Sequence, residues 1–314
     1  MASETISVPV QYLQWQPLYE TERPFLRLFK PPPENEDDRA TNLVFETKSV
    51  DLQDIRELET SPTLDSHGFQ IVESATQITD FQNTVIVNEK YLAECEGILK
   101  ATVGDADEVF CFDWRVRDSA SQKSTNNVNT ASKPATSTSG GMKSDDVERA
   151  RAYDPENRAA MLSPALLVHI DYGVASVVSR IRLHFKENAD RLLRGRFRVI
   201  NFWRPLVNDV EDWPLAVCDG STLARSDVIE ADHDRETFSE VSLYCLSRES
   251  HRWYFQSHHR PDEALLVKIY DSDTDVKARY CPHTSVKLPN VPPEAPSRKS
   301  IEVRALVLAY PKDE

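Results

Sequence analysis

The stretch Ala165–Asp171, with the sequence ALLVHID, places a histidine and an aspartate two residues apart at the end of a short apolar run. We expect the apolar residues to form a buried strand. Side chains at positions i and i+2 of an extended chain point to the same side, so His169 and Asp171 would face one point. The pair could hold a metal ion. It is also common as a surface or capping pair, so the rest of the chain has to decide.

Six histidines follow His169 and could supply a third ligand: His184, His233, His251, His258, His259 and His283. Four of these lie on a predicted helix, in a polar acidic segment or in a turn, which leaves His251 and His283. Arg298 and Ser300 follow His283 and again stand at i and i+2. A guanidinium and a hydroxyl on one face suit the distal carboxylate of a dicarboxylic acid. This pairing favours His283, and His251 remains the alternative.

Two imidazoles and one carboxylate on one face of a metal ion form the facial triad of non-haem Fe(II) oxygenases. The three remaining positions are free for a bidentate cosubstrate and for O2. In isolation, Arg298 is more readily explained as a solvated charge near a Pro-rich turn. The ordered set of H-x-D, distal histidine and R-x-S is much harder to obtain by chance.

From residue 163 onward the chain is rich in predicted strands. Apolar residues in Val174–Phe185 have helical spacing, whereas Arg196–Trp203 alternates as a strand does. Further strands are predicted at Glu240–Leu246, Arg252–Gln256, Ala264–Tyr270 and Ile301–Ala309. Successive strands with few long helices between them indicate an antiparallel sandwich or barrel.

We expect a single domain over residues 1–314, in which 1–117 form a mixed α/β elaboration and 163–309 the core. The N-terminal part contains an amphipathic helix at Glu89–Val103 and an aromatic strand at Val109–Trp114. Residues 118–146 are dominated by Ser, Thr, Asn and Gly, and they bury too little apolar surface to offset their ordering entropy. This segment is predicted to be a disordered surface loop, with a substrate lid as the alternative.

Composition excludes several functional classes. The formal charge of −14 disfavours nucleic acid and anionic membranes as partners. Neither a phosphate-binding glycine loop nor a G-x-S-x-G nucleophile motif occurs. Five cysteines without close pairs indicate free thiols in a reducing compartment. We see no signal peptide and no apolar run long enough to span a bilayer, so we expect a cytoplasmic protein.

Several longer strings carry a resemblance. They are VHIDYG (168–173), NFWRPL (201–206), WPLAVCD (213–219), HRWYF (251–255), DEALLVKIYDSD (262–273), CPHTSV (281–286) and RKSIEVRAL (298–306). In this order they resemble the fungal asaB-like hydroxylase/desaturase (gibberellin desaturase-like) family of Fe(II)/2-oxoglutarate-dependent oxygenases. The N-terminal strings VQYLQW (10–15) and FCFDWRVR (110–117) are similar but less specific.

The resemblance implies a mainly β protein with flanking helices around a double-stranded β-helix, that is, a jelly-roll or cupin-like core. It implies Fe(II) on His169, Asp171 and His283, and the cosubstrate 2-oxoglutarate on Arg298 and Ser300. The reaction would use O2 to oxidise a C–H bond of a small organic molecule, by hydroxylation or desaturation. Family analogy points to a secondary metabolite as substrate. A homodimer or a heterodimer stays open.

Asn201 and Arg204, in the string NFWRPL, could hydrogen-bond the cosubstrate or the substrate, or they could tie loops together. Two other functions remain to be distinguished. One is a non-catalytic jelly-roll partner subunit of an oxygenase complex, which should have lost a metal ligand. The other is a cupin-like metal enzyme that does not use 2-oxoglutarate, against which Arg298 and Ser300 argue.

Overall fold

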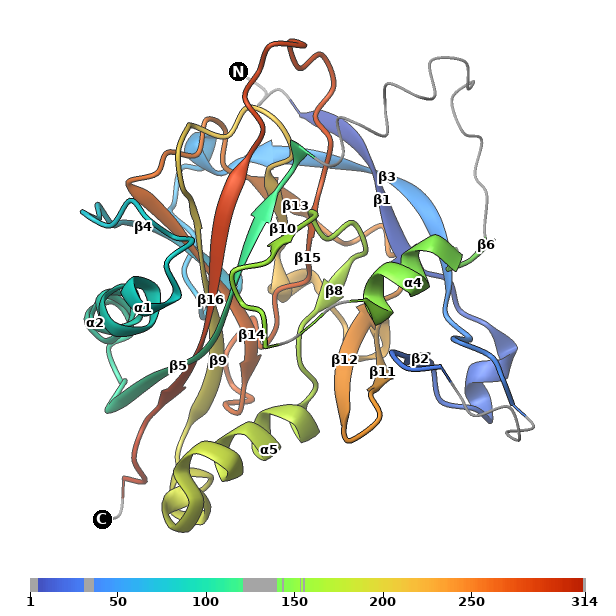
Figure 1. Ribbon diagram of the computed structural model, residues 1–314, viewed down its shortest axis with the longest axis horizontal. Helices are drawn as coiled ribbons and strands as arrows, with labels where there is room; N and C mark the ends of the chain where they lie inside the picture. The colour runs from blue at the N-terminus through green and yellow to red at the C-terminus, as the bar shows by residue number, and fades with distance from the viewer. Residues whose placement is uncertain are drawn as a thin grey trace.

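The computed structural model describes residues 5–30, 37–120, 140–142, 144–152, 154 and 156–312. In these residues two curled β-sheets face each other (Figure 1). The larger sheet has the order β1-β3-β13-β10-β15-β8-β12-β11-β2, with β6 paired to β3. Its strands are β1 (Ile6–Leu13), β2 (Phe25–Arg27), β3 (Val44–Asp54), β6 (Gly140–Gly141), β8 (His169–Ile170), β10 (Leu215–Cys218), β11 (Val228–Asp234), β12 (Ser239–Cys245), β13 (Trp253–Phe255) and β15 (His283–Ser285).

The smaller sheet has the order β4-β14-β9-β16-β5-β7. Its strands are β4 (Phe69–Glu73), β5 (Glu108–Asp118), β7 (Met161–Leu162), β9 (Phe197–Pro205), β14 (Glu263–Asp271) and β16 (Lys299–Leu308). The α-helices are α1 (Thr84–Ile86), α2 (Leu92–Thr102), α4 (Ser144–Arg151), α5 (Val174–Phe185) and α6 (Ala189–Leu192), and a π-helical turn covers Val87–Tyr91. Short 3₁₀ turns cover Pro17–Glu20, Ile55–Glu57, Lys186–Asn188, Gly220–Thr222 and Arg225–Asp227.

Strand β9 is buried along its whole length because both of its faces are covered. Val199 and Trp203 point into the core between the two sheets. Ile200 and Phe202 point the other way, into a second core that includes Leu99 of α2. Figure 1 shows α1 and α2 beside the smaller sheet, and this helical layer explains why β9 carries apolar residues on both faces.

The predicted fold class is confirmed: the protein is mainly β, with flanking helices around a jelly-roll core. The predicted helix at Val174–Phe185 coincides with α5. Most of the predicted surface loop, residues 121–139 and 143, lies outside the described residues. All five cysteines are free and buried. Within the described part of the chain, the helices are too short or too polar to cross a membrane.

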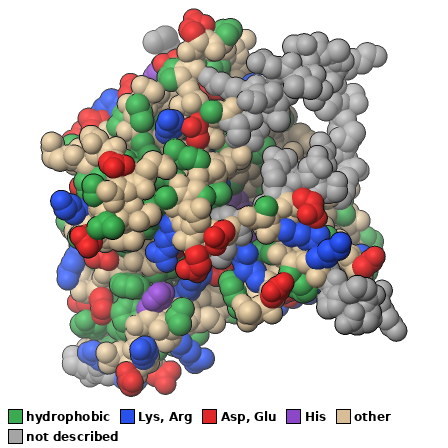
Figure 2. All heavy atoms as spheres, viewed as in Figure 1, with side chains coloured by type: hydrophobic (Ala, Val, Ile, Leu, Met, Phe, Trp, Pro, Cys, Tyr) green, Lys and Arg blue, Asp and Glu red, His purple; other side chains and the backbone are tan. Residues whose placement is uncertain are grey.

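Charged side chains of both signs are mixed on the face drawn in Figure 2. There, Lys and Arg lie among Asp and Glu. Basic residues are therefore not gathered into a stripe on that face.

Candidate metal centre

The two histidines of the predicted triad are direct neighbours across a pair of strands. His169 on β8 is the register partner of His283 on β15, and their ring centroids are 4.5 Å apart. Asp171 follows β8 immediately. Antiparallel pairing thus brings together ligands that are far apart in the sequence.

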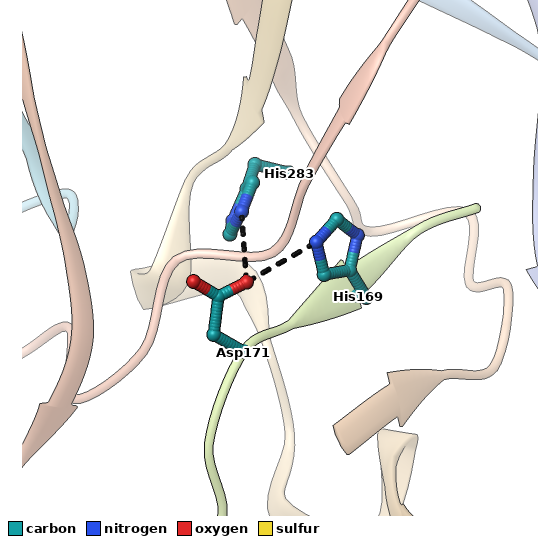
Figure 3. Close-up of side chains that lie close together, drawn as sticks. All are labelled: His169, Asp171 and His283. Atoms are coloured by element: carbon teal, nitrogen blue, oxygen red, sulfur yellow. Dashed lines mark ion pairs between the residues drawn. The ribbon is translucent and has the colours of Figure 1, made fainter. Parts of the chain in front are cut away.

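The three side chains converge on one point (Figure 3). The Nε2 atoms of His169 and His283 lie 3.3 and 3.7 Å from Oδ1 of Asp171. The other ring nitrogens are held by the backbone, because Nδ1 of His169 is 2.8 Å from the carbonyl of Leu167 and Nδ1 of His283 is 3.1 Å from that of Cys281. A proton on Nδ1 leaves the Nε2 lone pair free to bind a metal.

Burial keeps His283 ready to act as a ligand. Its side chain is almost fully buried, and burial together with the nearby His169 lowers its pKa to about 4. The imidazole is therefore neutral at physiological pH. A protonated ring could not donate a lone pair to a metal ion.

The two carboxylate oxygens of Asp171 have different partners. Oδ1 faces the histidines, while Oδ2 accepts hydrogen bonds from Nδ2 of Asn201 at 2.8 Å and from Nε of Arg304 at 2.7 Å. Burial alone would raise the pKa of Asp171, but Arg304 and the histidines together hold it well below its usual range. The carboxylate is thus ionised.

This donor set fits Fe(II). Two neutral imidazole nitrogens and one carboxylate oxygen on one side of an ion are the ligands of a facial triad. Two cis ligands at about 2.1 Å from an ion are about 3 Å apart, close to the separations found. Among the described residues, His169, Asp171 and His283 form the one group of His, Cys, Asp and Glu close enough to share a metal ion.

Arg298 is a buried cation that makes no ion pair with the residues that the structure describes. All three of its guanidinium nitrogens are buried and lack a hydrogen-bond partner in the described structure, and so does Oγ of Ser300. Burial, with Arg117 nearby, lowers the pKa of Arg298 to about 9. The guanidinium carbon lies 5.5 Å from the ring centre of Trp203. Buried polar groups of this kind need a partner, and a carboxylate would satisfy both residues.

Glu302 links this cation to the metal centre. Ser300, Glu302 and Arg304 stand two residues apart along β16, so their side chains lie on the same face of the strand. Beyond the larger effects of burial, the carboxylate of Glu302 acts on the pKa of both His283 and Arg298. Glu302 is therefore close enough to both sites to interact electrostatically with each of them.

The structure separates the other predicted site residues. Asn201 lies at the metal centre, where it bonds Asp171. Arg204 does not reach the centre, because the alternation of β9 turns it toward α2, where it bonds Ser74 and lies 3.4 Å from Glu94.

His251, the alternative distal ligand, is also held elsewhere. Its ring lies 3.2 Å from the hydroxyl of Tyr12 and 3.4 Å from a carboxylate oxygen of Asp227. These contacts fit a histidine that ties β1 to the turn before β11 and not a metal ligand.

Two features of the site escaped sequence analysis. Arg304 stands at an even spacing from Arg298 and Ser300, so its position on the same face could have been found. His233, in the segment predicted as a polar loop, lies on β11, with Nε2 3.1 Å from the hydroxyl of Tyr244. Tyr244 is the register partner of His169, which places His233 beside the centre. Only the strand pairing reveals this.

Comparisons with known proteins agree with this geometry. A family model described as an oxidoreductase/YMDC permease-like domain matches residues 10–308. The Fe(II)/2-oxoglutarate-dependent dioxygenase nvfI of Aspergillus novofumigatus is 32% identical over 265 residues, which cover 82% of each chain. The hydroxylase/desaturase efuI of Hormonema carpetanum is 32% identical over 279 residues, covering 85% of this chain and 86% of that protein.

Among solved structures, the iron and alpha-ketoglutarate-dependent endoperoxidase NvfI is similar over 98% of this chain and 99% of its own, with a TM-score of 0.76 and 29% identity. The similarity extends over nearly the whole length of both chains. The chain therefore belongs to the fungal family of Fe(II)/2-oxoglutarate-dependent oxygenases that includes these hydroxylase/desaturases, and it is an oxidoreductase that uses Fe(II), 2-oxoglutarate and O2 and acts on small molecules.

Proposed function

We propose that Fe(II) is held by Nε2 of His169, Oδ1 of Asp171 and Nε2 of His283. The observation that carries this assignment is the convergence of these three atoms from two neighbouring strands and the residue that follows one of them. When bound, Fe(II) supplies the activation of O2, coupled to oxidative decarboxylation of 2-oxoglutarate to succinate and CO2.

Arg298 and Ser300 would hold the distal carboxylate of 2-oxoglutarate. The guanidinium offers a planar fork and the hydroxyl a further donor, and both are buried without a hydrogen-bond partner among the described residues. Trp203 beneath the guanidinium limits where the fork can point. Holding the diacid at one end fixes the position of its 2-oxo acid end, so that the protein contributes orientation and exclusion of water.

The reaction would be oxidation of a C–H bond in a secondary metabolite, by hydroxylation or desaturation. The names of the relatives as hydroxylase/desaturases support this reading. No ligand has been lost from the triad, which argues against a non-catalytic partner subunit. The buried guanidinium of Arg298, which has no hydrogen-bond partner in the described structure, argues against a metal enzyme that does not use a 2-oxo acid. The five free, buried cysteines support a cytoplasmic location.

The test compares Asp171→Ala and His283→Ala with His251→Gln, which changes the alternative ligand. We expect both triad variants to lose bound Fe(II) and 2-oxoglutarate decarboxylation, because each removes one of three ligands. His251→Gln should keep both. Metal content after anaerobic loading and succinate formation are the measurements. Retention of stoichiometric iron by His283→Ala would contradict the assignment.

A further inference from the structure

Arg304 contacts three carboxylates with three different nitrogens. Nε donates to Oδ2 of Asp171 at 2.7 Å, Nη1 to Oδ2 of Asp113 at 2.8 Å, and Nη2 to Oε1 of Glu302 at 2.7 Å. The side chain is only 12% exposed. Any rotation of the guanidinium would break several charge-assisted hydrogen bonds in a buried setting, so its orientation is fixed.

The strand register explains this arrangement. Arg304 on β16 is the partner of Asn201 on β9 and of Asp113 on β5. The two neighbours that donate to Oδ2 of Asp171 therefore stand side by side on adjacent strands. The smaller sheet thus presents two fixed hydrogen-bond donors to Asp171, which directly follows strand β8 of the larger sheet.

With two donors on Oδ2, Asp171 has one oxygen left for the metal. Oδ1 is the oxygen that faces both histidines. A carboxylate free to turn could bind an ion through both oxygens and occupy a fourth position. One oxygen per carboxylate leaves three positions open, the number needed for a bidentate cosubstrate and O2.

We propose that Arg304, assisted by Asn201, is a positioning residue that restricts Asp171 to binding iron through Oδ1 alone. This inference rests on the proposed triad. It assigns to the smaller sheet a direct role in setting how many positions of the metal ion stay open. Asp113 and Glu302 act through Arg304, since they hold its guanidinium in place.

The experiment measures Co(II) binding to the full chain by anaerobic calorimetry, together with the visible spectrum of the Co(II) protein, which reports coordination number. Arg304→Gln should raise the Kd for Co(II) by about 10- to 100-fold and change the visible spectrum of the Co(II) protein. Asn201→Ala should shift both in the same direction to a smaller extent. Arg304→Lys, which keeps the charge and one donor, should restore part of the affinity.

Arg196→Gln is the matched control. Arg196 also pairs with both oxygens of a buried aspartate, Asp271, in the smaller sheet, but away from the triad. This variant should lower the Tm and leave the Co(II) Kd and spectrum unchanged.

A wild-type Kd and spectrum in Arg304→Gln, with a Tm loss like that of Arg196→Gln, would overturn the proposal. If Arg304→Gln does not fold, Asn201→Ala and Arg304→Lys decide by the same criterion. Failure of the triad itself would look different, since His283→Ala would then retain Co(II). Loss of Co(II) in His283→Ala with normal binding in Arg304→Gln would sink this inference alone.

Discussion

At the scale of single residues, the burial of Arg298 makes its proposed role in binding 2-oxoglutarate testable. A buried guanidinium without a hydrogen-bond partner costs folding free energy that a bound carboxylate recovers. Arg298→Gln should therefore raise the KM for 2-oxoglutarate by roughly 30- to 700-fold, which corresponds to about 2–4 kcal/mol. The same change should leave the Tm of the ligand-free protein equal or higher.

Arg204→Gln serves as the comparison. Arg204 is also buried, but it lies on the face of β9 opposite to Trp203, the residue that Arg298 contacts. We expect Arg204→Gln to lower the Tm while the KM for 2-oxoglutarate stays unchanged. Steady-state kinetics and thermal melts of the two variants give the answer. A KM that rises equally in both would show that stability, not contact with the diacid, controls cosubstrate binding.

His259 makes folding sensitive to acid. Burial lowers the pKa of His259 from 6.5 to about 4. The unfolded chain therefore binds the proton more tightly, so the free energy of unfolding should fall by up to about 3 kcal/mol as the pH drops from 6.5 toward 4. His259→Gln should flatten this dependence. Urea unfolding at several pH values measures it, and an equal slope in the variant would refute the prediction.

The sequence could predict the triad because its residue types and order are distinctive. It could not reveal that Asn201 and Arg304 share one oxygen of Asp171. That contact depends on the register between β9 and β16, which no local pattern encodes. Arg204 was grouped with Asn201 for its place in one string, although strand alternation sends the two side chains to opposite faces.

At the scale of elements, Gly173 couples β8 to α5. A Cβ on Gly173 would lie 2.7 Å from Cγ1 of Val241, a contact too short to keep. Gly173→Ala should displace the segment that carries Asp171 and weaken metal affinity. The double variant Gly173→Ala/Val241→Ala should recover most of it, because the obstructing methyl group is removed.

Calorimetric titration of the single and double variants tests this coupling. Normal affinity in Gly173→Ala would show that the segment yields without moving Asp171. Failure of the double variant to recover would assign the loss to the remaining close contact, Cδ2 of Leu243 at 3.2 Å from the added Cβ.

Elements with clear periodicity were predicted well, and α5 and β14 lie within a residue or so of their expected bounds. Strand β11 was missed because its residues, VIEADHD, are mostly charged or polar. It is only half-buried, so its pairing with β12, and not a hydrophobic pattern, holds it in place.

At the scale of the whole molecule, a metal ion would join strands that meet only in the folded state. Ligands that bind only the native protein raise the free energy of unfolding, by about 2.7 kcal/mol at a free concentration of 100 Kd. Mn(II) with 2-oxoglutarate should therefore raise the Tm, and EDTA should reverse the shift. Calorimetric melts test this, and an equal shift in Asp171→Ala would indicate binding elsewhere.

The position of β16 in the smaller sheet has a consequence for biosynthesis. Among the described strands it comes last in chain order, yet it lies between β9 and β5. While the ribosome is still translating the preceding residues, those two strands have open edges and the nascent chain lacks the arginine that steadies the carboxylate ligand. The metal centre therefore cannot be completed until β16 has inserted between β9 and β5, and a product truncated before β16 would lack both a central strand of this sheet and the arginine beside Asp171.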